Sequence, residues 1–110
     1  MVYYWFMISI QVSIEGDTQE FYLNKLKFVI GRGTDCDIKV DDAGISRKHL
    51  EVEVEGDQFY IIDLGTVNGT YINGERIESR KRTEYFPFLP LVLGSQVELA
   101  MEINIEGTAD

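Results

Sequence analysis

Two short polar segments, 44–49 and 65–68, carry the side chains most able to bind an anion. These side chains are Ser46, Arg47, Lys48, Thr66 and Asn68. The residues between the segments, Leu50–Leu64, alternate and then become apolar, which indicates two antiparallel strands joined by a turn. Such a hairpin brings both polar segments to the same edge of a sheet. Hydroxyl, cationic and amide donors that converge on one place favour a phosphate.

Arg32 is a further candidate, because it lies in a loop between Gly31 and Gly33. Glycine permits a tight turn there, from which the arginine can reach outward. Each of these charged residues alone is most simply a solvated surface residue. Their combination on neighbouring loops favours a binding site over chance.

Catalysis is the alternative chemistry for the same residues. Ser46 could act as a nucleophile, His49 as its base and Asp63 as the residue that orients the base. No nucleophile elbow surrounds Ser46, and one histidine that caps a loop needs no chemistry to explain it. The sequence therefore favours binding over hydrolysis. No group of residues suggests a metal site, since Asp41-Asp42 lacks further oxygen ligands in register.

The elements that must position these residues are strands. Apolar and polar residues alternate in Ile8–Ile14, Leu50–Glu55 and Val97–Ile105, which indicates half-buried antiparallel strands. Shorter strands are expected at 20–23, 27–30, 38–40, 59–62 and 70–72. Asn73-Gly74 suits a type I′ hairpin. Ser79–Pro90 is predicted to be a long loop because two prolines exclude a central strand. With no helical period, the chain is expected to form an all-β sandwich or barrel.

Composition narrows the class of function. The chain has 110 residues, 45% of them hydrophobic, which suits one globular domain spanning 1–110. A net charge of −9 disfavours binding to nucleic acid or anionic membranes. The single cysteine, Cys36, excludes an intrachain disulfide, and Met1–Ile8 lacks the basic residues of a secretory signal. A reducing cytoplasm is the expected compartment.

The motifs of this sequence resemble those of a forkhead-associated (FHA) domain. The resemblance covers residues 28–77 and rests on Gly31-Arg32, Thr34–Ile38, Ser46–His49, Asp63-Leu64, Asn68-Gly69-Thr70 and Asn73-Gly74, in that order. It implies a β-sandwich of about eleven strands whose loops at one end bind phosphothreonine peptides. It also implies a non-catalytic module that needs no cofactor.

The resemblance assigns roles to individual residues. Phosphate contacts are implied for Arg32, Ser46, Arg47, Thr66 and the backbone N–H of Val67, and Asn68 is expected to hold the main chain of the peptide. Scaffold roles are implied for Gly31, His49, Gly69 and Asn73. Val67 offers no polar side chain, and Gly44 offers no side chain to read a downstream residue of the peptide.

The expected partner is therefore a phosphothreonine-containing protein, marked by an upstream Ser/Thr kinase. Two apolar stretches, 3–6 and 85–93, leave an alternative open. The simpler interpretation is that the second stretch folds over the sandwich and both pack internally. The other is that they form a contact with a partner or a homodimer, in a phosphate-independent assembly domain.

Overall fold

The computed structural model describes the backbone of residues 2–109 and the side chains of residues 6–104. Over that range the chain forms β strands and no helix. The strands are β1 (Val2–Ile14), β2 (Asp17–Leu23), β3 (Lys27–Gly31), β4 (Ile38–Lys39), β5 (Leu50–Glu55), β6 (Gln58–Asp63), β7 (Thr70–Ile72), β8 (Glu75–Arg76), β9 (Thr83–Tyr85), β10 (Leu91–Leu93) and β11 (Val97–Ala109). No helix that could cross a membrane occurs among the described residues.

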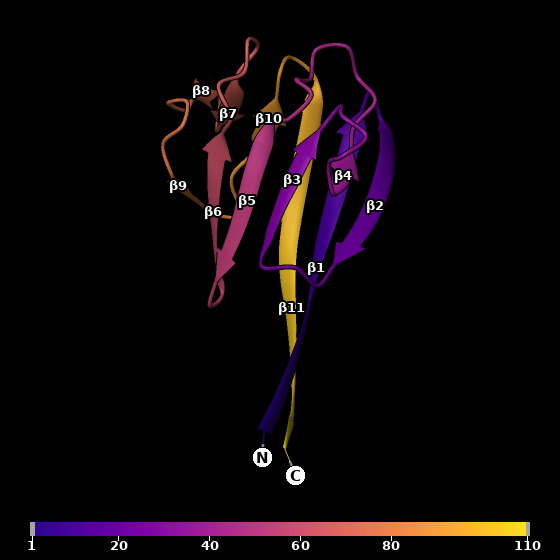
Figure 1. The fold of residues 1–110 in the computed structure, drawn as a ribbon, viewed down its shortest axis with the longest axis vertical. Coiled ribbons are helices and arrows are strands. Elements are labelled where there is room, and N and C mark those ends of the chain that lie inside the picture. The colour runs from indigo at the N-terminus through magenta and orange to yellow at the C-terminus, as the bar shows by residue number, and fades with distance from the viewer. Residues whose placement is uncertain (1, 110) are drawn as a thin grey trace.

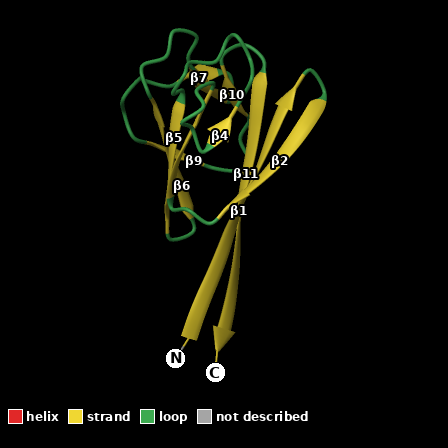
Figure 2. Ribbon diagram, turned by 45° about the vertical axis from the view of Figure 1, so that its right-hand side comes forward, coloured by secondary structure: helices red, strands yellow, loops and turns green. Residues whose placement is uncertain are grey.

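The strands form two sheets that pack face to face (Figures 1 and 2). Sheet A has the order β2-β1-β11-β10-β7-β8, and sheet B has the order β4-β3-β5-β6-β9. Inward-facing residues of both sheets are buried, as the alternation predicts. They include Ile8, Ile10, Val12, Phe28, Ile30, Leu50, Val52, Phe59, Ile61, Leu91, Leu93, Val97 and Leu99. The all-β sandwich expected from the sequence is confirmed.

The β5–β6 hairpin places the two polar segments together. Leu50 pairs with Asp63, so the start of β5 and the end of β6 lie side by side. The β3–β4, β4–β5 and β6–β7 loops all lie at the end of the sandwich opposite the two chain ends (Figure 1). We call this end, with its three loops, the loop end. Asn73 at φ 52° and Gly74 at φ 82° form the predicted type I′ turn between β7 and β8.

The segment 79–90 is not a loop throughout, which corrects the sequence-based expectation. Thr83–Tyr85 forms β9, which pairs with β6 at the edge of sheet B. Both prolines follow this strand, so they do not interrupt its hydrogen bonds. Before it, Ser79 forms a parallel bridge with Asp63. An edge strand needs pairing on one side only. β9 has three residues, of which only Tyr85 is buried, so the sequence shows no clear alternation there.

β1 and β11 extend beyond both sheets as a two-stranded arm (Figure 2). β2 pairs with β1 only from Ile8 onward, and β10 pairs with β11 only as far as Leu99. The register between β1 and β11 continues to Val2 opposite Ala109. Residues 106–109 therefore continue the strand beyond Ile105, where the alternation in the sequence ends.

Candidate functional site

The β3–β4 and β4–β5 loops are joined through their main chains. The N–H of Arg32 donates to the Ser46 carbonyl at 3.0 Å, and the N–H of Gly33 donates to the Arg47 carbonyl at 2.9 Å. Gly31 makes this approach possible, because a Cβ at its position would lie 2.3 Å from the Arg47 oxygen. These contacts bring Arg32, Ser46 and Arg47 together, as the sequence predicts.

The polar groups of these three residues remain available to a ligand. Arg32 and Arg47 are exposed, and Ser46 is half-buried. Among the hydrogen bonds and ion pairs between described residues, none involves the Ser46 hydroxyl or either guanidinium group. Lys48 differs, since its ammonium group pairs with the Asp35 carboxylate at 3.5 Å in an exposed ion pair. Two cations and one hydroxyl donor can thus meet an anion without first breaking a contact.

His49 connects the β4–β5 loop to the β6–β7 loop. Its Nδ1 accepts the Ser46 N–H at 3.1 Å, so Nε2 carries the proton and donates to the Gly69 carbonyl at 2.9 Å. The side chain is fully buried. Burial lowers the pKa of His49, which keeps the ring neutral as its Nδ1 contact requires. Since main-chain groups occupy both ring nitrogens, the imidazole is not placed to take a proton from the Ser46 hydroxyl.

The Asp63 carboxylate, at the end of β6, holds the β6–β7 loop in place through hydrogen bonds. Its carboxylate accepts hydrogen bonds from the hydroxyls of Thr66, Thr70 and Ser79 at 2.7–2.8 Å. It also accepts the N–H groups of Gly65 and Thr66, both at 3.1 Å. Burial raises the pKa of Asp63, but these hydrogen bonds outweigh it and lower the pKa to about 2. The buried carboxylate is therefore ionised and acts as a structural anchor of the loop.

Thr66 requires a correction, because its side chain does not face the place where an anion would bind. It is 6% exposed, and its hydroxyl donates to Asp63 while accepting the N–H of Gly69 at 3.0 Å. The Thr66 N–H also donates to Asp63. Both donors of this residue are thus occupied, and Thr66 shapes the loop instead of contacting phosphate. The spacing Asp-x-x-Thr is the sequence signal that could have indicated this local bond.

Arg76 of β8 holds the tip of the same loop, and the sequence reasoning missed it. Its Nη2 donates to the carbonyls of Thr66 and Val67 at 3.1 and 3.2 Å. It passes so close to Gly69 that a Cβ there would lie 2.6 Å from its Nε. In a trans peptide the C=O and N–H point in opposite directions. Because Arg76 binds the Thr66 carbonyl, the Val67 N–H points away from Arg76.

Val67 and Asn68 complete the loop end. The Val67 side chain is 85% exposed, and its N–H has no acceptor among the described residues. Asn68 is exposed, and its Nδ2 donates to the Gly44 carbonyl at 2.9 Å, which links the β6–β7 and β4–β5 loops. Asn73, in contrast, lies in the β7–β8 turn, where its N–H donates to the Pro90 carbonyl at 2.8 Å.

Cys36 supports the β4–β5 loop from the side. The thiol is half-buried and donates to the Arg47 carbonyl at 3.0 Å. Burial raises the pKa of this thiol. The residue therefore packs and donates as a neutral group. No cluster of three or more metal-ligating side chains occurs among the described residues.

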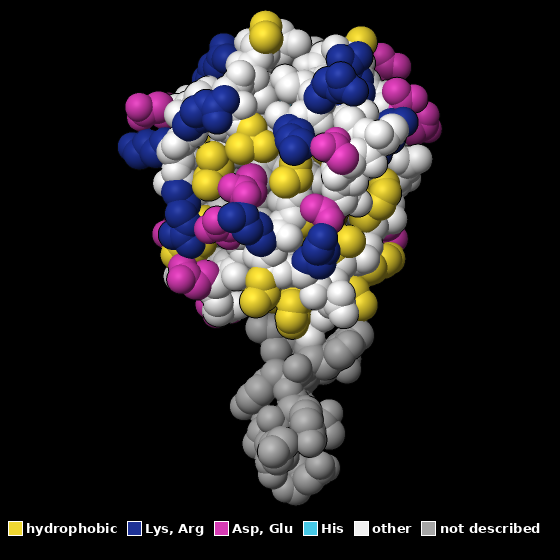
Figure 3. Space-filling view, viewed as in Figure 1, with side chains coloured by type: hydrophobic (Ala, Val, Ile, Leu, Met, Phe, Trp, Pro, Cys, Tyr) yellow, Lys and Arg dark blue, Asp and Glu magenta, His cyan; other side chains and the backbone are white. Residues whose placement is uncertain are grey.

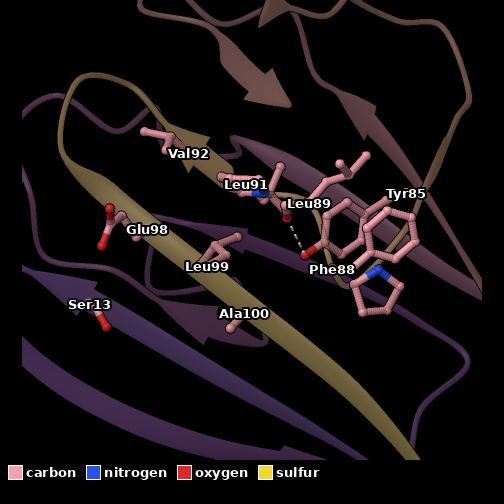
Figure 4. Close-up of a pocket in the computed structure, with 11 residues that line it drawn as sticks. Ser13, Tyr85, Phe88, Leu89, Leu91, Val92, Glu98, Leu99 and Ala100 are labelled. Atoms are coloured by element: carbon pink, nitrogen blue, oxygen red, sulfur yellow. Dashed lines mark hydrogen bonds between the residues drawn. The ribbon is translucent and has the colours of Figure 1, made fainter. Parts of the chain in front are cut away.

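The apolar stretch 85–93 is only partly covered. Tyr85, Leu91 and Leu93 are buried, and the Tyr85 hydroxyl donates to the Leu89 carbonyl at 3.3 Å (Figure 4). Phe86 and Phe88 are 43% and 81% exposed. Beside Phe88 lies a cavity of about 340 Å³, which is also lined by residues 98–100 of β11 (Figure 4). None of the anion-binding candidates lines it. In the other stretch, Phe6 packs against the core, and residues 3–5 lie outside the described side chains.

Comparison with known proteins identifies the family. The model of the FHA domain matches residues 28–89, which is more than half of the chain. The glycogen accumulation regulator GarA of Mycolicibacterium smegmatis is 42% identical over 59 residues, which cover 54% of this chain and 37% of GarA. The oxoglutarate dehydrogenase inhibitor of Corynebacterium jeikeium is 44% identical over 55 residues, which cover 50% of this chain and 38% of that protein.

Comparison with a solved structure identifies the same family over a larger part of the chain. This structure comes from a structural and functional analysis of phosphothreonine-dependent FHA domain interactions, and it is 26% identical to this chain. It superimposes with a TM-score of 0.71 over 86% of this chain and 95% of its own. Family model, sequence relatives and fold agree: the chain belongs to the forkhead-associated (FHA) family.

Proposed function

We propose that the loop end binds a phosphothreonine-containing segment of a protein partner. Arg32, Arg47 and the Ser46 hydroxyl bind the phosphate from one side, and the Val67 N–H binds it from the other. Asn68 holds the main chain of the ligand just after the phosphothreonine. The observation that carries this proposal is the pair of main-chain bonds from Arg32 and Gly33 to Ser46 and Arg47, which gathers unpaired donors in one place.

The charge of the ligand suits these donors. A phosphothreonine carries about −1.5 to −2 charges at pH 7 and strong acceptor oxygens. Hydrogen bonds to charged groups contribute about 1.5–3 kcal/mol each. The chain as a whole has a net charge of −9, which repels an anionic ligand, so the unpaired cations of the loop end set this end apart as a place for it.

The relatives support this function. The structural neighbour was studied for phosphothreonine-dependent interactions, and GarA and the oxoglutarate dehydrogenase inhibitor are named for regulation or inhibition. The role is binding without turnover, since His49 has both ring nitrogens occupied. A Ser/Thr kinase that writes the mark follows from the chemistry of the ligand, and a reducing cytoplasm suits such a partner.

Calorimetric titration tests the proposal. The ligands are matched peptide pools that carry phosphothreonine, phosphoserine or no phosphate. We expect micromolar binding to the phosphothreonine pool alone. Arg32→Ala should cost about 2 kcal/mol of binding free energy or more and leave the fold intact. Equal affinity of the Arg32→Ala variant would remove Arg32 from the site, and no binding to any pool would reject the function.

A second candidate function is assembly through an apolar surface. Phe86 and Phe88 are exposed, with ring centroids 5.8 Å apart, beside the cavity against β11. Homodimer formation through this surface would be phosphate-independent. Light scattering over a dilution series tests it: association that disappears in a Phe88→Ser variant supports the contact, and a strict monomer at high concentration rejects it.

A further inference from the structure

The arginines of this chain fall into two groups by their partners. Arg82 forms ion pairs with Glu53 and Glu55, both at 2.9 Å. Arg32, Arg47, Arg76 and Arg80 appear in none of the ion pairs between the described side chains. The chain has 19 acidic residues against 10 basic ones, so acidic partners are plentiful. These four guanidinium groups thus have no acidic partner among the described side chains. Arg32 and Arg47 are proposed phosphate contacts and Arg76 donates to loop carbonyls, which leaves Arg80 without a role.

Arg80 is fixed beside the β6–β7 loop. Its N–H donates to the Asp63 carbonyl at 2.8 Å, and the preceding Ser79 hydroxyl donates to the Asp63 carboxylate at 2.8 Å. The backbone of Arg80 adopts φ 61°, a left-handed conformation that is uncommon for a residue with a long side chain. The anchor that holds the β6–β7 loop therefore also holds Arg80.

The Arg80 guanidinium lies over Gly65, the second residue of the loop after β6. A Cβ at Gly65 would meet its Nη2, Nε and Cζ atoms at 2.9, 3.2 and 3.3 Å. The side chain is exposed and donates no hydrogen bond to the described residues. Its sequence neighbour Lys81 is different, because its ammonium group pairs with Glu78 at 3.7 Å. Arg80 thus presents a positioned, unpaired cation to solvent at the loop end.

The strand order of sheet B gives the distance of Arg80 from the phosphate site. β3, β5, β6 and the Ser79 bridge are successive neighbours, and each step is about 4.8 Å. From the end of β3, where Arg32 lies, to Ser79 is thus about 14 Å. Several Lys and Arg side chains lie in the upper part of this face, and others lie lower down among Asp and Glu side chains (Figure 3). A ligand that extends at about 3.3 Å per residue covers this main-chain distance in about four residues. The long side chains of Arg32 and Arg80 can reach toward the ligand, so a separation of two to four residues fits.

The two ends of the β6–β7 loop indicate on which side of the phosphothreonine the ligand passes Arg80. Asn68, at the β7 end, donates to Gly44 and is the proposed contact for the residue after the phosphothreonine. Gly65, with Arg80 over it, is at the β6 end. We infer that Arg80 binds a second anionic group of the same ligand, two to four residues before the phosphothreonine. This inference depends on the proposed phosphate site, and the anion is either a carboxylate or another phosphate.

The test compares four peptides in calorimetric titrations with the full chain. They share one sequence and carry unmodified threonine, phosphothreonine alone, phosphothreonine with glutamate three residues before it, or phosphothreonine with phosphoserine there. We expect the glutamate to increase affinity about threefold to fivefold, as an exposed ion pair does. The phosphoserine should give about tenfold or more, because guanidinium binds phosphate through two parallel hydrogen bonds.

The variant Arg80→Gly should abolish both gains while binding the singly phosphorylated peptide as before. Glycine accepts the left-handed backbone of this position, so the variant keeps its fold. Lys81→Ala removes the same charge one residue away and should keep both gains. Moving the glutamate three residues after the phosphothreonine should give no gain that depends on Arg80.

The possible results separate this inference from the proposed function. If the singly phosphorylated peptide fails to bind, or binds Arg32→Ala equally well, the phosphate site itself is wrong. If it binds and depends on Arg32, but neither added anion improves affinity, Arg80 is no binding residue. The added anions could also raise the affinity equally for Arg80→Gly, or lose their effect equally in Lys81→Ala. Either result would mean that only net charge matters, and it would overturn the inference.

Discussion

Two regions of the molecule use charge in opposite ways. On the outer face of sheet B, Arg82 pairs with Glu53 and Glu55 and stacks over Tyr60, 3.6 Å from the ring centroid. At the loop end, buried His49 and Asp63 contact only neutral groups, and the nearby arginines lack acidic partners. Exposed ion pairs add little to stability, whereas buried polar groups are costly to leave unsatisfied. Apart from Arg76, the loop end is thus fixed by neutral donors, and Arg32 and Arg47 are left for a ligand.

The largest expected effect is the loss of the Asp63 anchor. Asp63→Ala leaves the hydroxyls and amides that bind this carboxylate without their acceptor in a buried place. We expect the free energy of unfolding to fall by about 3 kcal/mol or more. Urea unfolding measures it, with Ser79→Ala as the control that removes a single donor and should cost about 1 kcal/mol. A loss below that of Ser79→Ala would contradict the role of Asp63.

The pH dependence of stability separates the two buried residues. The folded pKa of His49 is lowered from 6.5, so the unfolded chain gains a proton before the folded one does. Stability is therefore complete above pH 6.5 and falls as the pH drops below it. Asp63 has a folded pKa of about 2 against 3.8, so its contribution is lost as the pH falls from about 4 toward 2.

Unfolding curves at a series of pH values, without peptide, measure both steps. His49 is the single histidine of the chain, so the variant His49→Gln should remove the step between pH 7 and 5 and keep the acid step. Stability that rises on acidification over this range would show that His49 binds a proton more tightly in the folded state than expected.

Arg76 differs from the other arginines near the loop end, because its guanidinium donates hydrogen bonds to carbonyl groups of the β6–β7 loop. Arg76→Gln should release the Thr66 and Val67 carbonyls and allow the Val67 N–H to turn. We expect about a fivefold loss of phosphopeptide affinity, equivalent to one hydrogen bond, with little change in stability. Lys81→Ala is the matched control for charge. Affinity that falls equally in both variants would mean that Arg76 acts only through long-range attraction.

The smallest expected effect is that of Arg82→Gln. Both of its ion pairs are exposed to solvent, so unfolding and phosphopeptide binding should stay within experimental error. Titration and urea unfolding in low and high salt provide the measurement. A large loss of stability would show that the outer face of sheet B carries more of the fold than its exposure indicates.

Local patterns in the sequence predicted much of this molecule. Alternation in Leu50–Glu55 and the Asn73-Gly74 turn reflect side-chain periodicity and backbone preference, both of which act over a few residues. Asp63, Arg76 and Arg80 could not be assigned in this way. Their contacts join segments that are distant along the chain, and only the folded sandwich brings Ser79 beside Asp63. Thr66 differs, because its hydroxyl bonds Asp63 only three residues away, and the Asp-x-x-Thr spacing could have indicated this local bond.

The arm formed by β1 and β11 has a mechanical consequence. Its outermost pair is Val2 with Ala109, and only these two strands pair along the arm. A force that pulls the two chain ends apart opens these pairs one after another, from the tip toward the sheets. A force between one chain end and a ligand held at the loop end instead runs along the strands, so that many hydrogen bonds share the load. The direction of pulling thus decides how much tension the molecule withstands.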